Sequence, residues 1–133
     1  TEVGIGVNAK KVRAYVEPDP SLDAGRGGYR LFAAGDRNKL WITNATHGAL
    51  VGIVARIGKD GKRVGLFVTR LPEHDVRREA GVDHEFWCRS SNTGAFTANH
   101  NARLHFDNYP LRKADEIQAD GVEVLFYCLR MGR

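Results

Sequence analysis

The alternation of apolar and polar residues predicts strands along most of this chain. Residues 10–18 (KKVRAYVEP) repeat with a period of two, which puts Val12, Ala14 and Val16 on one buried face. Tyr15 falls on the opposite face, among charged residues. The first element is therefore expected to be a strand with one covered side.

Short strands and a hairpin are predicted next. Residues 29–35 and 39–45 form two apolar runs separated by G-D-R-N. Residues 49–57 and 63–72 flank G-K-D-G-K, in which Asp60-Gly61 is a strong hairpin signal because glycine tolerates a positive φ. The first arm of this hairpin is apolar on both faces, which predicts a central strand covered on each side.

The next part of the chain has a charged stretch followed by a stretch in which apolar and polar residues alternate. Residues 73–85 (EHDVRREAGVDHE) are charged and predict an exposed loop, which we call the excursion. Residues 101–110 (NARLHFDNYP) return to alternation, with Leu104 and Phe106 on one face. Pro110 is expected to end this strand, since proline cannot donate to a strand ladder.

The last stretch, residues 121–133, changes from a strand period to a helical one. Val122, Leu125, Phe126 and Leu129 fall at i, i+3, i+4 and i+7, which is one face of a helix. The chain stops inside this pattern, so we expect it to be a piece of a longer protein. The fold class predicted is all-β, with two packed antiparallel sheets or a flattened barrel and the start of a helix at the C-terminus.

Composition narrows these expectations. The chain has 133 residues, of which 42% are hydrophobic, as is usual for one folded domain, and no apolar run approaches the roughly 20 residues of a membrane helix. The net charge of +4 is spread along the chain and suits a solvated surface, although it can attract nucleic acid or a phosphorylated small molecule. Cys88 and Cys128 lie far apart and the histidines show no ligand spacing, so neither a disulfide framework nor a metal site is predicted.

The stretch 38–48 (NKLWITNATHG) contains the most specific candidate chemistry. Trp41 and Thr43 are two residues apart, so on a strand they point to the same face. An indole beside a hydroxyl suits one wall of a site for a flat ring with a polar edge. The alternative is a buried core tryptophan and an ordinary strand threonine.

Several stretches, taken in order, resemble the middle β-domain of acyl-CoA dehydrogenases. The resemblance spans the whole chain, and its strength lies in the order and spacing of the motifs rather than in any one of them. The matching stretches are TEVGIGVN (1–8), KLWITN (39–44), AR (55–56), LFVT (66–69), RSSNT (89–93), FDNYP (106–110) and the helix that starts at Gly121.

The resemblance implies a flavin site. In this family the flavin of FAD contacts the positions that correspond to Thr1, Trp41 and Thr43, and the loop that carries Gly6 and Val7 lies against the substrate. The family has serine at position 7, and a valine there cannot donate a hydrogen bond.

The resemblance also implies a reaction and a domain division. The family removes the α-proton and β-hydride of an acyl-CoA thioester, with a glutamate base from a helical C-terminal domain. That base is expected beyond Arg133, so no catalytic residue is expected within the chain. Residues 1–120 would be the β-domain and residues 121–133 the start of the helical domain.

Further expectations concern the partners and the compartment. They are an electron-transfer flavoprotein or another electron acceptor, a homo-oligomer when the protein is full length, no nucleic acid, no membrane span, and a cytoplasmic or mitochondrial-matrix location.

Two alternatives stay open from the sequence. One is a flavin monooxygenase or nitroalkane oxidase of the same fold, which Val7 keeps in consideration. The other is a non-catalytic basic β-barrel that binds nucleic acid or sugar. This second alternative needs a face of aromatic and basic residues, for which Phe86-Trp87 beside Arg89 is the only indication.

Overall fold

The computed structural model describes residues 12–43, 45–46, 50–91, 100–118 and 120–131, and among these it leaves out the side chains of residues 39–41, 43, 122, 125, 128 and 129. The elements are β1 (Tyr15–Asp19), η2 (Asp23–Gly25), β2 (Gly28–Ala33), η3 (Gly35–Arg37), β3 (Lys39–Thr43), β4 (Leu50–Ile57), β5 (Val64–Arg70), β6 (Glu85–Ser91), β7 (Asn101–Arg112), η4 (Lys113–Asp115) and α1 (Gly121–Met131).

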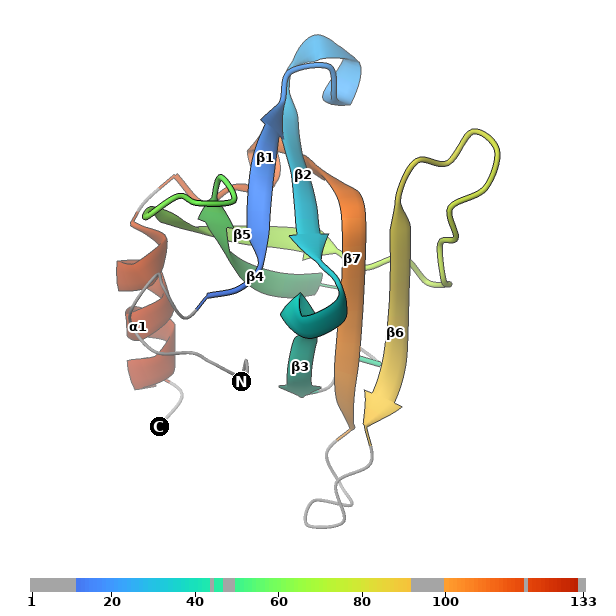
Figure 1. The fold of residues 1–133 in the computed structure, drawn as a ribbon. Helices are drawn as coiled ribbons and strands as arrows, with labels where there is room; N and C mark the ends of the chain where they lie inside the picture. The colour runs from blue at the N-terminus through green and yellow to red at the C-terminus, as the bar shows by residue number, and fades with distance from the viewer. Residues whose placement is uncertain (1–11, 44, 47–49, 92–99, 119, 132–133) are drawn as a thin grey trace.

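The strands form one seven-stranded sheet in the order β3-β7-β2-β1-β4-β5, with β6 paired to β7. In Figure 1, β4 and β5 run across the direction of β1, β2 and β7, so the sheet bends over its own core. The predicted all-β class is confirmed. One pair departs from the antiparallel expectation, because β1 runs parallel to β4.

The core lies on the inner face of this bent sheet. Its largest fully buried side chains include Phe67, Phe86 and Phe106, from three different strands. The predicted buried face of the first strand is confirmed, since Val12, Ala14 and Val16 are all buried. Tyr15 is buried as well, contrary to the prediction, because its ring stacks on Phe32 of β2 at 4.9 Å between ring centroids.

The prediction that β4 is covered on both faces is wrong. Ile53 and Ala55 are buried, whereas Leu50 is 63% exposed and Val68 of the adjacent strand is 39% exposed. β4 is central in the sheet order but contributes only one face to the core. Apolar residues on the second face do not require a covering layer, because folded proteins expose many apolar atoms.

The hairpin around Asp60-Gly61 is confirmed, since β4 and β5 pair antiparallel on either side of it. The positive φ lies at Gly58 (+83°) rather than at Gly61. Gly61 is required for a different reason. A Cβ at this position would lie 1.8 Å from the carbonyl oxygen of Ile57.

Replacing Gly61 with alanine is therefore expected to lower the free energy of unfolding by about 1–3 kcal/mol, since the turn must open to admit the methyl group. Gly52→Ala is the matched control. A Cβ at Gly52 would meet only a leucine methyl, at 3.7 Å, so this change is expected to be neutral or slightly stabilising. Urea denaturation of both variants measures the difference, and equal midpoints would contradict the prediction.

Pro110 does not end its strand, because β7 continues to Arg112. β6 pairs with β7 only as far as Asp107, so beyond that residue one edge of β7 has no partner among the described strands and can accept a proline. Asn108 precedes this stretch with a φ of +54°, in the left-handed region that asparagine tolerates. It lies where the register with β2 shifts, between Leu31 and Ala33, as in a β-bulge.

The buried carboxylate of Glu116 connects the segment after β7 to β2 and to the turn before β5. Glu116 is 5% exposed and accepts hydrogen bonds from the Tyr29 hydroxyl at 2.5 Å and from Lys113 Nζ at 2.6 Å. Arg63 NH2 lies 3.0 Å from the same carboxylate. Lys113 Nζ also contacts the Tyr29 hydroxyl oxygen. This carboxylate therefore links three parts of the chain, namely β2, the turn before β5 and the segment after β7.

The predicted C-terminal helix is confirmed as α1, and Asp120 caps its start by accepting a hydrogen bond from the Glu123 amide at 3.2 Å. A Cβ at Gly121 would lie 2.7 Å from the Leu66 amide nitrogen, so glycine lets the helix approach β5 closely. Over the described parts of the chain, none of the helices combines the length and the hydropathy that a bilayer crossing requires. The division at residue 120 stays a prediction.

Candidate functional site

The residues predicted to contact flavin and substrate lie mostly at the limits of the described structure. Thr1, Gly6 and Val7 lie outside the described residues. Trp41 and Thr43 are on β3, as predicted, but their side chains are not described. Their orientation toward a flavin therefore stays a prediction.

β3 sits at the end of the sheet order and pairs with β7. The register puts Ile42 opposite Ala102 and Thr43 opposite Asn101, and Ile42 packs against the core. In the described part of the chain, no strand pairs with the other edge of β3. Backbone donors and acceptors along that edge therefore have no strand partner among the described residues.

β7 also brings the stretches that carry the family resemblance together. It pairs with β3 along one edge and with β6 along the other, and Ala102 is opposite Ile42 on one side and Ser90 on the other. Residues 39–43 of the KLWITN stretch, the start of RSSNT and the FDNYP stretch therefore lie on three neighbouring strands. Arg89 and Ser91 belong to β6.

The charged excursion before β6 is folded back along the edge of that strand. Val76 and Phe86 exchange two backbone hydrogen bonds, each of 2.9 Å. Next to them, Arg89 donates two hydrogen bonds to the Asp75 carboxylate, at 2.9 and 2.6 Å. These bonds from Arg89 lower the pKa of Asp75 below its ordinary value of 3.8, so the carboxylate stays charged.

The other end of the excursion is anchored as well. Arg78 donates to Asp107 of β7 at 2.9 Å, and Arg30 of β2 forms an ion pair with Asp83 at 3.0 Å. The side-chain amide of Asn108 donates to the backbone oxygen of Asp83 at 3.0 Å. The prediction of an exposed excursion is confirmed, but its path is fixed at both ends.

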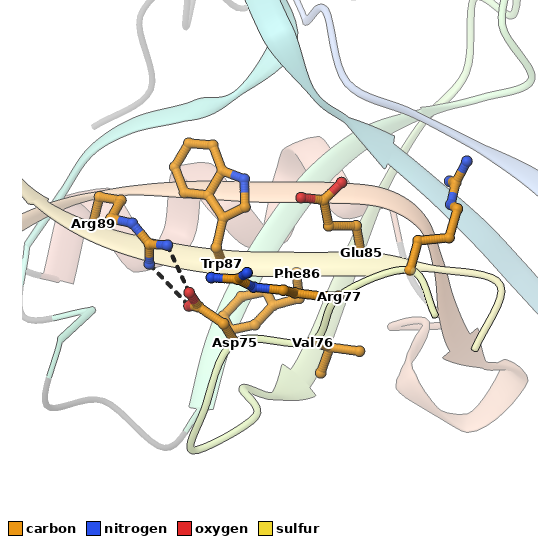
Figure 2. A pocket seen from close by; sticks show the side chains of 8 residues that line it. Asp75, Val76, Arg77, Glu85, Phe86, Trp87 and Arg89 are labelled. Carbon is orange, nitrogen blue, oxygen red and sulfur yellow. Dashed lines mark hydrogen bonds and ion pairs between the residues drawn. The ribbon is translucent and has the colours of Figure 1, made fainter. Parts of the chain in front are cut away.

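A hollow of about 400 Å³ lies between residues 75–78 of the excursion and residues 85–89 of β6. Figure 2 shows the Trp87 indole and the Glu85 carboxylate projecting from the same side of β6, with Arg77 arriving from the excursion. Phe86 contributes to the lining from the core side and is 2% exposed. We call this feature the Trp87 hollow.

The indole of Trp87 is held in place by two neighbours. His105, its direct cross-strand partner, stacks on it with 4.7 Å between ring centroids and an interplanar angle of 11°. The Arg89 guanidinium lies 5.4 Å from the ring centroid, within cation–π range. Sequence reasoning gave Phe86-Trp87-Arg89 as a possible aromatic and basic face, and the structure divides it. Phe86 belongs to the core, whereas Trp87 and Arg89 line the hollow.

His105 connects the Trp87 hollow to the start of β3. Its Nδ1 lies 3.2 Å from Asn38 Oδ1, one residue before that strand begins. Its Nε2 is buried without a hydrogen bond in the described structure and lies 3.7 Å from Glu85 Oε2, within ion-pair range but too long for a hydrogen bond. No local signal in the sequence identifies this contact, because it depends on the register of β6 against β7.

The side chains that line the hollow are suited to binding. They include guanidinium, carboxylate and indole groups but no serine, cysteine or histidine nucleophile. Among the described residues, no group of three or more His, Cys, Asp or Glu side chains is placed to hold a metal ion.

Comparisons with known proteins give matches in structure only. No protein-family model matches the chain. No sequence among curated proteins matches it either. The solved structures that match include a Bacillus anthracis acyl-CoA dehydrogenase complexed with FAD (TM-score 0.67, 20% identity, 100% of this chain covered). They also include a glutaryl-coenzyme A dehydrogenase in a glutaryl-CoA complex (0.63, 19%, 95%) and acyl-CoA oxidase-1 of Caenorhabditis elegans complexed with FAD and ATP (0.64, 18%, 89%).

The chain spans only a small part of these proteins, namely 20% of the first, 28% of the second and 18% of the third. The likeness establishes that the chain has the fold of a β-rich segment found in acyl-CoA dehydrogenases and oxidases.

Proposed function

We propose that the chain is the β-domain of an FAD-dependent oxidoreductase that dehydrogenates an acyl-CoA thioester. The observation that carries this proposal is the KLWITN stretch on β3, an end strand of a fold shared with FAD-complexed acyl-CoA dehydrogenases and oxidases. Neither part would suffice alone, because a fold hosts many functions and a short motif recurs by chance.

Two features of β3 support the proposed flavin site. An isoalloxazine has two flat faces and a rim of hydrogen-bonding atoms. The free edge of β3 offers backbone groups for such a rim, and the strand carries an indole and a hydroxyl two residues apart. Trp41 would pack on the ring, while Thr43 and Thr1 would donate hydrogen bonds to its polar side.

FAD, when bound, accepts the hydride of the substrate. The chain positions the ring through β3 and approaches the substrate through the loop of Gly6 and Val7. The base that takes the α-proton is proposed to come from another domain of the whole protein, so the 133-residue chain alone is expected to be inactive. In the whole protein we infer an acyl-CoA substrate, an electron-transfer flavoprotein or another acceptor, and a homo-oligomer.

The test uses the longest natural version of this protein. After purification its visible spectrum is recorded, and octanoyl-CoA is then added without oxygen. A yellow protein that bleaches supports the proposed reaction. A yellow protein that keeps its colour favours a flavin monooxygenase or nitroalkane oxidase of the same fold. A colourless protein that takes up no added FAD contradicts the flavin proposal.

In that protein, Trp41→Ala is expected to weaken FAD binding about tenfold or more, and Thr43→Val about threefold to tenfold, since each removes a contact to the ring. Flavin fluorescence titration measures both. Trp87→Phe is the control, because Trp87 lies on β6, across β7 from β3. Unchanged FAD affinity in the Trp41 and Thr43 variants would contradict the assigned roles.

A further inference from the structure

One cation of the Trp87 hollow, Arg77, makes no hydrogen bond or ion pair among the described residues, and its charge acts on Asp75, a carboxylate that Arg89 already binds. Arg78 and Arg89 also line the hollow, but they are paired with Asp107 and Asp75 respectively. Arg77 is exposed and has no hydrogen bond or ion pair among the described residues. A guanidinium in this state can bind a carboxylate or a phosphate with two parallel hydrogen bonds.

The hollow also offers an aromatic surface. His105 stacks on the Trp87 indole and the Arg89 guanidinium lies 5.4 Å from its ring centroid, and the indole also forms part of the lining of the hollow. Because these neighbours already order the indole, a ligand ring that packs against it costs the protein little conformational entropy on binding. Both anchors of the excursion, at Asp75 and at Asp83, hold Arg77 near this ring before any ligand arrives.

Glu85 supplies a complementary acceptor. Its carboxylate projects from the same side of β6 as the indole (Figure 2), and among the described residues its recorded partner is the Nε2 of His105, at 3.7 Å. A hydrogen-bond donor on a ligand ring, or an ammonium group, can therefore be accepted at this end of the hollow. The volume of about 400 Å³ is at the small end of ligand sites.

We propose that the Trp87 hollow binds a small molecule that combines a flat aromatic ring, an anionic group and a hydrogen-bond donor. The ring packs against the part of the Trp87 indole that lines the hollow, the anion binds Arg77, and the donor binds Glu85. Two kinds of molecule share this chemistry, namely an aminopurine nucleotide such as AMP and an aromatic amino acid such as phenylalanine. The proposal concerns β6 and the excursion, so it does not rest on flavin binding at β3.

The proposal is tested by NMR titration of the 133-residue chain labelled with ¹⁵N. AMP and L-phenylalanine are added in separate series, with adenosine and inorganic phosphate as partial probes. The indole signal of Trp87 is assigned from the Trp87→Phe variant. We expect either AMP or L-phenylalanine to shift that signal and the amides of residues 75–78 and 85–89. The molecule that does so shows whether the ligand is a nucleotide or an amino acid.

Variants then assign the contacts. Arg77→Ala is expected to weaken binding about fivefold and Trp87→Leu about tenfold, whereas Arg26→Ala, an exposed arginine of the loop before β2, leaves the affinity unchanged. If AMP binds, Glu85→Gln weakens AMP about threefold and leaves inosine monophosphate, which lacks the amino group, unaffected. Trp87→Phe retains an aromatic ring and serves if Trp87→Leu does not fold.

Three results overturn the proposal. One is that neither AMP nor phenylalanine moves these signals at millimolar concentration. Another is that phosphate alone binds as tightly as AMP, because the ring then has no part. The third is that binding survives both Arg77→Ala and Trp87→Leu unchanged. A flavin spectrum in the longer protein depends on none of these outcomes, so failure here leaves the proposed reaction intact.

Discussion

Replacing Phe106 with alanine is expected to lower the free energy of unfolding by about 3–5 kcal/mol, the largest effect of any single change considered for this protein. Phe106 is 0% exposed and contacts Phe86 and Tyr109, with 5.1 and 5.2 Å between ring centroids. The truncated side chain leaves a cavity in the core beside β7. This strand pairs with β2, β3 and β6.

Urea denaturation followed by circular dichroism measures this loss. Tyr127→Ala is the matched control, since it also removes an aromatic ring but from a position that is 65% exposed. We expect a change within about 0.5 kcal/mol for the control. A loss below about 1.5 kcal/mol for Phe106→Ala would mean that the site closes over the cavity or that the ring is not buried.

Replacing Glu116 with glutamine is expected to cost about 2–4 kcal/mol at neutral pH, because the change leaves the buried Tyr29 hydroxyl and the nearby cations without their charged acceptor. The side chain of Glu116 is 2% exposed, whereas those of Lys113 and Arg63 are 52% and 72% exposed and can turn to water. The loss should therefore stay below the full cost of stranding two buried charges.

This contribution depends on pH in a defined direction. Burial raises the pKa of Glu116, but the hydrogen bonds from Lys113 and Tyr29, with the positive charges of Lys113 and Arg63, outweigh it and hold the pKa below its ordinary value of 4.5. A lowered native pKa stabilises the fold above the unfolded value and loses that effect as pH falls.

The difference in unfolding free energy between the wild type and Glu116→Gln should accordingly shrink as the pH is lowered from 4.5. Asp36→Asn is the control, because Asp36 pairs with Arg13 at 3.8 Å and both side chains are more than half exposed. A constant difference across this range would show that the ionised form of Glu116 is not the stabilising species.

Local parts of the fold followed from the sequence. The hairpin at Asp60-Gly61 and the two strands divided by G-D-R-N depend on residues close together in the chain, and β4–β5 and β2–η3–β3 form as expected. The helix from Gly121 also follows from a local period. Short-range chemistry sets these elements, so it was sufficient to predict them.

Features that depend on contacts between distant parts of the chain could not be predicted from the sequence. The parallel pairing of β1 with β4, the burial of Tyr15 beneath Phe32 and the stacking of Trp87 on His105 all depend on which strands become neighbours. Pro110 shows the same limit, because its position in a strand depends on where β6 stops. Periodicity identifies a strand but not its partner.

The candidate site divides in the same way. The position of Trp41 and Thr43 on a strand was predicted from alternation and from the family resemblance, and both lie on β3. The Trp87 hollow was not predicted, since its parts come from an excursion and a strand that meet only through the Val76–Phe86 bridge and the Arg89–Asp75 pair.

The central place of β7 has a consequence for the order in which the protein folds. β4 and β5 are joined by a short turn and can pair early, whereas β3 and β6 pair with a strand that is synthesised after both of them. Pairing across long stretches of chain is slow because loop closure costs entropy before any contact forms. The strand proposed to hold the flavin and the strand of the Trp87 hollow thus gain their partner in the same late event. In a nascent chain that ends before residue 101, neither β3 nor β6 has a strand to pair with.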